Sequence, residues 1–314
     1  MKKTNKDLTR VLIYLAITFT ITWGFCLLVL YPVINGESLS GIPSMVAQLQ
    51  VMGIMFFPSI GVLLTRLITK EGFREAWLKP NLKKNLKFYL LAWFGPGVLT
   101  LLGMIVYFVS FPNKLDLNFS YFYQVLESAG APMEELPIPL GLLMVVQCVQ
   151  AFLLAPAMNF VTCFGEEWGW RGYLLPKMNK LLPTVPTLLI TGVIWGLWHA
   201  PLTIIGHNYG MGYPGYPFTG IAMMCLFCVT LGIFMSYVTL KTGSCIPAIL
   251  AHGAVNGIAA IGIYFTVDGG NPFVGPAPTG IIGMIPFLVI AVFMVIRLKR
   301  KKGSPCQGSC QKSI

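Results

Sequence analysis

The sequence predicts an all-α membrane protein, a polytopic bundle of about eight transmembrane helices that forms a single membrane domain over residues 1–314. Three observations predict this class. Hydrophobic residues make up 55% of the chain and charged residues only 11%, which is far from the composition of a soluble domain. Apolar runs of about 18 residues or more recur along the chain, and each is long enough to span a bilayer. The charges also alternate in sign between successive connections.

The apolar runs give the order of the expected spans. They are 11–33, 44–67, 86–110, 140–165, 184–204, 218–240, 245–266 and 279–297. The first run is too long for the core of a signal peptide and has no small-residue cleavage site after it, so we expect it to remain as a span. A basic tail follows the last run and is typical of an anchor on anionic lipids.

The positive charges indicate the orientation. Every Lys and Arg except Lys114 falls on the segments that lie inside when the N-terminus is inside. The outer segments carry the acidic residues Glu37, Asp116, Glu127, Glu134, Glu135 and Asp268. This positive-inside pattern predicts an N-in, C-in protein with an even number of spans. The formal charge of +11 therefore reflects topology, so we expect a lipid bilayer and no nucleic acid as partner.

Two adjacent carboxylates, Glu166 and Glu167, end the fourth apolar run, and Arg171 follows them. A charge in hydrocarbon costs about 2.5–3.5 kcal/mol on insertion scales, so charged residues in such runs mark functional positions. On a helix Glu167 and Arg171 share a face and can pair, whereas Glu166 points about 100° away. The spacing thus predicts one carboxylate held by the Arg and its neighbour left for acid–base chemistry.

Two later runs carry polar residues that could face Glu166. His199 follows Trp195 by four residues, so the two side chains share a helix face, and His252 and Asn256 share a face in the same way. Helices in lipid turn such groups toward one another or toward a water-filled cavity. We therefore expect these residues to form one cluster with Glu166.

The cluster can form only if its residues lie at the same depth in the membrane. Glu166 lies near the inner end of its expected span, whereas His199 lies nearer the outer end of its own. The groups meet if the fourth helix continues past Arg171 toward Leu175 and Pro176, which the apolar residues there allow. We expect this extension, and with it a site below the cytoplasmic surface that water reaches from inside.

The expected cluster can hydrolyse a peptide bond. A Glu carboxylate beside an imidazole can take a proton from water, and a second imidazole with an Asn amide can donate hydrogen bonds to the developing oxyanion. Alternatively, Glu166, His199 and His252 bind a divalent metal such as zinc, which activates the water. No HExxH motif is present, so such a metal would be held across three helices. The residues leave the metal-dependent and metal-independent mechanisms open.

At these residues the chain resembles the CPBP family, which comprises the intramembrane CAAX prenyl endopeptidases and their bacteriocin-processing or immunity relatives, also called the Abi family. The family pattern is Glu-Glu-x-x-x-Arg, then Phe-x-x-x-His, then His-x-x-x-Asn/Asp. The matching stretches here are 166–171, 195–199 and 252–256. Trp195 stands where the family has Phe; we expect the aromatic wall of the cavity to be kept and the choice of substrate to change.

The resemblance implies an eight-helix intramembrane endopeptidase with a site open toward the cytoplasm. It implies that Glu166 is the general base and His199 its assistant, and that His252 and Asn256 stabilise the oxyanion. Glu167, Arg171 and Trp195 would orient these groups. The domain would then divide into family-variable spans 1–139, a catalytic core 140–260, and the last span with its basic tail, 279–314. The family is described both as metalloproteases and as metal-independent glutamic proteases.

The expected substrates are membrane-associated peptides or membrane proteins. We expect a prokaryotic plasma membrane, where peptide maturation or immunity to a bacteriocin is a more natural role than CAAX processing. Two other classes of function use the same buried groups. One is a proton- or ion-coupled transporter or channel, for which inverted repeats would be expected and none is visible. The other is a non-catalytic immunity protein that binds a peptide.

Overall fold

The computed structural model describes residues 2–36, 45–131, 136 and 138–302. Helices account for most of these residues, and no β-strand occurs among them; two isolated bridges pair Leu115 with Thr266 and Asn271 with Gly275. The predicted all-α class is confirmed. Parts of two expected outer connections lie outside the described residues, namely 37–44 with Glu37, and 132–135 and 137 with Glu134 and Glu135. Most of the expected basic tail, from 303, lies outside them as well.

Each of the expected spans corresponds to a helical segment, and several segments are built from consecutive helices. The first four segments are α1 (Lys2–Phe25) with a π-helical turn (Cys26–Leu30) and α2 (Tyr31–Gly36); α3 (Met45–Ile54) with α4 (Phe57–Ile68); α5 (Leu86–Ser110); and α7 (Leu140–Leu153), α8 (Ala155–Met158), α9 (Phe160–Gly169), the π-helical turn η5 (Trp170–Leu174) and α10 (Leu175–Leu181). The last four are α11 (Thr184–Trp198) with α12 (Ala200–Ile204); α13 (Phe218–Thr242); α14 (Ile246–Ile258) with α15 (Ile261–Tyr264); and α16 (Ile281–Lys302).

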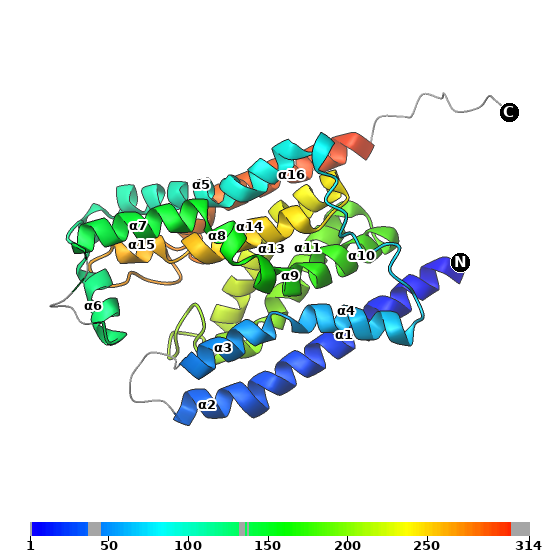
Figure 1. The fold of residues 1–314 in the computed structure, drawn as a ribbon, viewed down its shortest axis with the longest axis horizontal. Helices are drawn as coiled ribbons and strands as arrows, with labels where there is room; N and C mark the ends of the chain where they lie inside the picture. Colours follow the sequence, from blue (N-terminus) through cyan, green and yellow to red (C-terminus); the bar gives the residue numbers. More distant parts are fainter. Residues whose placement is uncertain (1, 37–44, 132–135, 137, 303–314) are drawn as a thin grey trace.

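The described helices have the length and composition of a polytopic membrane protein. Six stretches are long and apolar enough to cross a bilayer: 6–35, 45–68, 86–110, 218–242, 246–264 and 281–299. The shorter apolar helices α7 and α11 belong to the other two expected spans. Figure 1 shows α1 beginning and α16 ending at the same end of the bundle, as an even number of crossings requires. The number of crossings and the N-in orientation stay predictions.

The fourth segment has the extension that the site requires. The helix that carries Glu166 passes through η5 and continues as α10 to Leu181, so the expected continuation past Arg171 is confirmed. The same segment is less regular than expected before Glu166, because α7, α8 and α9 replace one continuous helix over 140–165. Pro156 at the start of α8 has no N–H to donate, which favours a break at that point.

The long connection after α5 also differs from the expected loop. It contains the short helix α6 (Ser120–Ser128), whose start is held by Asp116. The carboxylate of Asp116 accepts hydrogen bonds from the backbone N–H groups of Asn118 and Ser120, at 2.8 Å each. The bond from Ser120 satisfies a donor that the beginning of a helix leaves unpaired, and the bond from Asn118 fixes the chain just before it.

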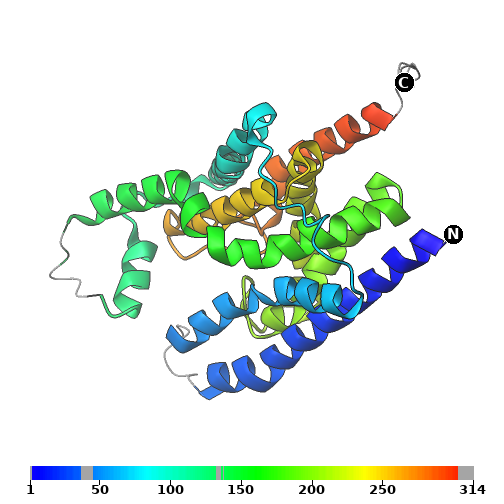
Figure 2. The same ribbon diagram turned by 45° about the vertical axis from the view of Figure 1, so that its right-hand side comes forward.

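The site-bearing helices lie in the middle of the bundle. In Figures 1 and 2, α1 and α4 run along one side and α5 and α16 along the other, with α9, α11, α13 and α14 between them. Small residues allow the close packing of these helices: a Cβ atom at Gly192 or Gly196 of α11 would lie 2.6 Å or 2.5 Å from a backbone Cα of α13. Such contacts are typical of helix pairs in membranes.

Candidate active site

Glu167 connects three parts of the site. It is completely buried, and its Oε1 accepts hydrogen bonds from the guanidinium of Arg171 and from Nδ1 of His252, at 2.9 Å each. The Arg171 bond has the i,i+4 spacing predicted from the sequence. The second bond brings α14 against α9, so Glu167 holds both the Arg and an imidazole. Its other oxygen, Oε2, is buried without a hydrogen-bond partner among the described residues.

Glu166 faces a different helix. Its side chain is 3% exposed, and its Oε2 accepts a hydrogen bond of 2.9 Å from the indole N–H of Trp195 on α11. This is the sole hydrogen bond of the Glu166 carboxylate within the described part of the chain. One oxygen is therefore fixed, and Oε1 remains an acceptor for a water molecule or a substrate group.

The ring of Trp195 is the contact surface shared by the cationic and imidazole groups. The guanidinium carbon of Arg171 lies 4.2 Å from the centre of a Trp195 ring, which is a cation–π geometry. The imidazoles of His199 and His252 meet the same indole edge-on, with centroids 5.6 Å and 5.4 Å away. The indole N–H adds a hydrogen bond to Glu166 that a Phe at this position could not make.

His199 lies where α11 ends and α12 begins. Its Nδ1 is 2.8 Å from the backbone carbonyl oxygen of Trp195. A carbonyl can only accept, so Nδ1 carries a proton and Nε2 of the neutral ring is an acceptor. The carbonyl is available because the backbone N–H of His199 bonds instead to Gly196, at 3.1 Å. The thiol of Cys228 on α13 also approaches Nδ1, at 3.8 Å.

Asn256 lies one turn beyond His252 on α14. It is exposed, unlike His252, and its amide contacts the sulfur of Cys163 at 3.6 Å. The nearby Asn159 donates to the backbone oxygen of Gly253 at 3.2 Å, which fixes α14 against the start of α9. Asn159 was not identified from the sequence. Its spacing of four and seven residues before Cys163 and Glu166 is the signal that could have found it.

The structure therefore brings most of the predicted site residues into direct contact and leaves two of them at the edge of the cluster. Direct contacts join one set: Glu166, Glu167, Arg171, Trp195 and His252. Within the predicted set, His199 touches Trp195, and Asn256 stands at the exposed end of the α14 motif. One potential metal-binding group occurs in the described chain, with ligand atoms from Glu166, Glu167 and His252 all within 4.8 Å of one another. It contains Glu167 where the sequence had suggested His199.

A comparison with protein-family models gives a match that falls on this site. A family model described as type II CAAX prenyl endopeptidase Rce1-like matches residues 148–258. This match is to a family of the CPBP type, which the three motifs resemble. The match includes all three motifs and the helices that bring them together, from the end of α7 to α14. A comparison with curated proteins gave no match.

The CPBP match explains why three polar motifs occur on apolar helices of this chain. The family is one of CAAX-type intramembrane proteases, so a buried set of carboxylate, imidazole and guanidinium groups is expected in its core. In this CPBP core those groups come from α9, η5, α11 and α14.

Proposed function

We propose that this protein is an intramembrane endopeptidase that hydrolyses peptide bonds of membrane-associated peptides or proteins. The observation that carries the proposal is the state of Glu166, a buried carboxylate with one oxygen fixed by Trp195 and the other without a hydrogen bond from any described residue. A carboxylate held in this way is suited to accept a proton from water. The family match supports the same class of reaction.

Glu166 acts as the general base in the proposed mechanism. Its Oε1 takes a proton from the attacking water while the bond from Trp195 holds Oε2 in place. The carboxyl group then gives this proton to the leaving amine as the C–N bond breaks, which returns Glu166 to its starting state. His199 assists by accepting a hydrogen bond at Nε2, the ring nitrogen that its contact with Trp195 leaves unprotonated.

His252 and Asn256 stabilise the oxyanion. Glu167 fixes the orientation of the His252 ring through Nδ1, so that Nε2 is the nitrogen that can face the substrate and, when protonated, donate to the oxyanion. The Asn256 amide is the second donor, one helical turn away. Removing one donor of this kind reduces turnover by about 10²–10³-fold in well-studied hydrolases. Glu167 and Arg171 act as positioning residues.

The same residues fit a divalent metal such as zinc. Two carboxylates and one imidazole are a common donor set, and the unpartnered Oε2 of Glu167 is an acceptor that a cation would satisfy. Glu166, Glu167 and His252 would hold the ion, which when bound would polarise the scissile carbonyl and acidify the attacking water. Metal analysis of the purified protein, with the Glu167→Gln variant as comparison, distinguishes the two mechanisms independently of activity.

The test of the proposed function is the Glu166→Gln variant. We expect it to lose cleavage of a membrane-tethered peptide library by about 10²-fold or more, because the amide cannot accept the proton of water. The matched control is Glu127→Gln on the exposed face of α6, which removes the same charge outside the site. Undiminished cleavage by Glu166→Gln contradicts the proposal.

The same variant distinguishes the other classes of function. Proton flux into liposomes that is lost with Glu166→Gln, without any proteolysis, would indicate a transporter or channel. Protection against a bacteriocin that persists in Glu166→Gln would indicate a non-catalytic immunity protein that binds peptides. We propose peptide maturation or bacteriocin immunity at a prokaryotic plasma membrane as the role, with the site open to the cytoplasm.

A further inference from the structure

A basic cavity lies between the beginning of α1 and the end of α4, outside the proposed catalytic site. It has a volume of about 500 Å³, and its lining residues are Lys6, Thr9, Arg10, Thr69 and Lys70. The lining thus contains three cations and two hydroxyl groups, and no acidic residue. A second cavity of about 370 Å³ shares Lys6 and Arg10 with the first.

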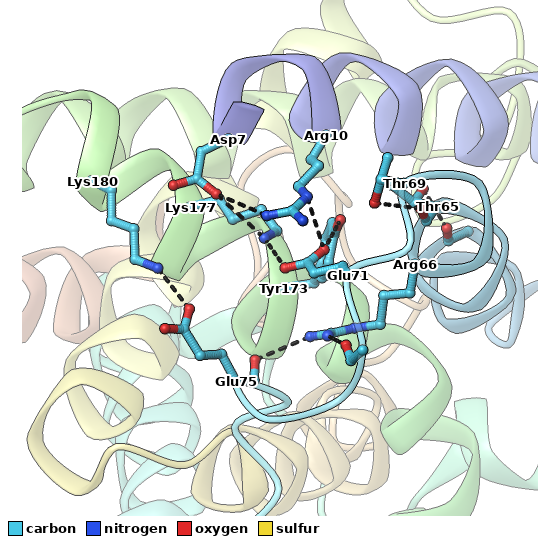
Figure 3. A network of polar contacts seen from close by, with 12 residues as sticks. Asp7, Arg10, Thr65, Arg66, Thr69, Glu71, Glu75, Tyr173, Lys177 and Lys180 are labelled. Carbon is cyan, nitrogen blue, oxygen red and sulfur yellow. Dashed lines mark hydrogen bonds and ion pairs between the residues drawn. The ribbon is translucent and has the colours of Figure 1, made fainter. Parts of the chain in front are cut away.

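The acidic residues near these cavities already have cationic partners. Figure 3 shows Glu71 between Arg10 of α1 and Lys177 of α10, with Asp7 beside them. Lys177 contacts both carboxylates, and on the surface Lys180 pairs with Glu75 at 2.6 Å. Asp7 and Glu71 therefore also offset the charge of Arg10, which lines the first cavity, whereas Lys6 and Lys70 of that lining take part in none of these ion pairs.

Positive charge remains in excess after this pairing. Lys6, Lys70 and Arg74 have no ion-pair partner within the described ranges of the chain. Arg66, 3% exposed, lines the second cavity, and its Nε has no hydrogen-bond partner there. Holding so many cations together is unfavourable unless water or an anion compensates them. Lysine ammonium groups around one cavity are groups that bind phosphate oxygens.

The position of the first cavity matches the level of lipid headgroups. It lies at the ends of two candidate spans, 6–35 and 45–68. Exposed aliphatic side chains continue from it along both helices, with Leu12 58% exposed, Leu67 70% and Ile68 62%. An amphiphile could therefore place an anionic group in the cavity and its acyl chains along these side chains.

We propose that the first cavity is an anion site that binds a phosphate group, carried either by an anionic phospholipid or by free phosphate. Lys6 supplies charge from α1, and Lys70 supplies it from the segment that follows α4. The hydroxyl of Thr69 lies in the same lining and donates to the backbone oxygen of Thr65 at 2.9 Å, so the lysines carry the proposed recognition. The site is separate from the proposed protease chemistry and does not depend on it.

The experiment uses the full chain in nanodiscs of phosphatidylcholine, with and without phosphatidylglycerol, and in detergent with inorganic phosphate. Lipid retained by the protein is measured by native mass spectrometry, and phosphate binding by the shift of the thermal unfolding midpoint. We expect the Lys6→Gln/Lys70→Gln variant to bind about tenfold more weakly or worse. Each Lys near an anionic surface adds to the free energy of binding, and this variant removes two. The matched control is Lys79→Gln/Lys83→Gln, two exposed lysines outside the cavity.

Each outcome decides the proposal. Selective retention of phosphatidylglycerol, weakened only in the cavity variant, supports the site and identifies lipid as the source of the phosphate. A midpoint shift by inorganic phosphate with the same dependence on the variant supports the site with free phosphate as its ligand. Equal losses in the cavity and control variants overturn the proposal, because the effect is then one of overall charge. Absence of binding in both arms overturns it as well.

Discussion

At the scale of single residues, Trp195 combines two kinds of contact in one side chain. Its N–H holds Oε2 of Glu166, while its ring contacts Arg171 and both imidazoles of the site. A Phe, the usual residue in the family pattern, would keep the ring contacts and lose the bond. In this chain the position of the proposed base therefore depends on an indole donor.

The Trp195→Phe substitution separates these two contributions. A hydrogen bond to a charged group contributes about 1.5–3 kcal/mol, so we expect cleavage to slow about tenfold or more. The loss should fall on kcat, because the aromatic ring and its contacts with Arg171 and the two imidazoles remain while the bond to the proposed base is lost. Trp93→Phe on α5 is the control, since its N–H donates to the backbone oxygen of Leu153 far from Glu166. A Trp195→Phe enzyme with unchanged kcat would contradict the positioning role.

Glu167 has a structural role that can be measured apart from catalysis. Glu167→Gln leaves the buried Arg171 without its counter-charge, and breaking a buried ion pair typically costs about 3–5 kcal/mol. We expect a large fall in thermal stability, partly restored in Glu167→Gln/Arg171→Met. Cleavage should stay low in the double variant, because His252 still lacks its carboxylate partner. The exposed pair Lys114–Asp268 is the control, and Asp268→Asn should leave unfolding nearly unchanged.

If the double variant regains both stability and cleavage, the bond from Glu167 to His252 has no function. If Glu167→Gln is as stable as the parent, the buried ion pair contributes nothing that the amide does not replace. Either result would revise the assignment of Glu167 as a positioning residue.

At the scale of helices, the site depends on close contact between α9 and the connection that joins α3 to α4. Gly165 precedes Glu166, and a Cβ atom there would lie 2.5 Å from the backbone oxygen of Met55 and 2.8 Å from Cα of Phe56. Backbone atoms cannot rotate away as a flexible side chain can. A methyl group at this position therefore has to displace α9, and Glu166 with it.

Gly165→Ala should lower both the unfolding temperature and cleavage, in spite of the better helix propensity of Ala. Overpacking of this kind costs about 1–3 kcal/mol. Gly24→Ala on α1 is the matched control, because no atom lies within 4 Å of a Cβ built there. We expect that control to retain activity and to be as stable as the parent or slightly more so. Equal behaviour of the two variants in thermal unfolding and cleavage assays would contradict the packing argument.

The limits of sequence-based prediction are also clearest at this scale. The Glu167–Arg171 pair and the shared faces of the two His motifs follow from helical spacing, which is a local property of the chain. The continuation of the fourth helix past Arg171 could be inferred from the apolar residues that follow it. The bonds from His252 to Glu167 and from Trp195 to Glu166 cross between helices, and their choice depends on packing that one sequence does not reveal. The breaks around α8 were missed because Pro156 lies in an otherwise continuous apolar run.

At the scale of the whole molecule, the first span is tied to the helix that carries the site. Glu71, in the connection after α4, is contacted by Arg10 of α1, Tyr173 of η5 and Lys177 of α10. Tyr173 and Arg171 both belong to η5, so the helical turn that contacts Glu71 also carries the Arg of the site. The carboxylate of Glu71 thus joins the N-terminal spans, outside the family match, to the matched residues 148–258.

The pH dependence of stability tests this connection. Burial alone would raise the pKa of Glu71, but the hydrogen bonds and charge of Lys177, the Tyr173 hydroxyl and the charge of Arg66 outweigh it, so the pKa lies below its ordinary value of 4.5. A carboxyl group whose folded pKa is depressed stabilises the fold above its unfolded pKa and loses that contribution as the pH falls through the folded pKa. We therefore expect the parent to unfold at a higher temperature than Glu71→Gln near neutral pH.

This difference between the two proteins should shrink below about pH 4.5 and vanish under stronger acid, because the parent carboxylate is then protonated as well. Thermal unfolding in detergent across this range measures it, with Glu127→Gln on the exposed face of α6 as the control for a lost surface charge. A difference that stays constant with pH would mean that the shape of Glu71 matters and its charge does not. Equal midpoints at neutral pH would show that the charge of Glu71 does not contribute to holding the N-terminal spans against the core.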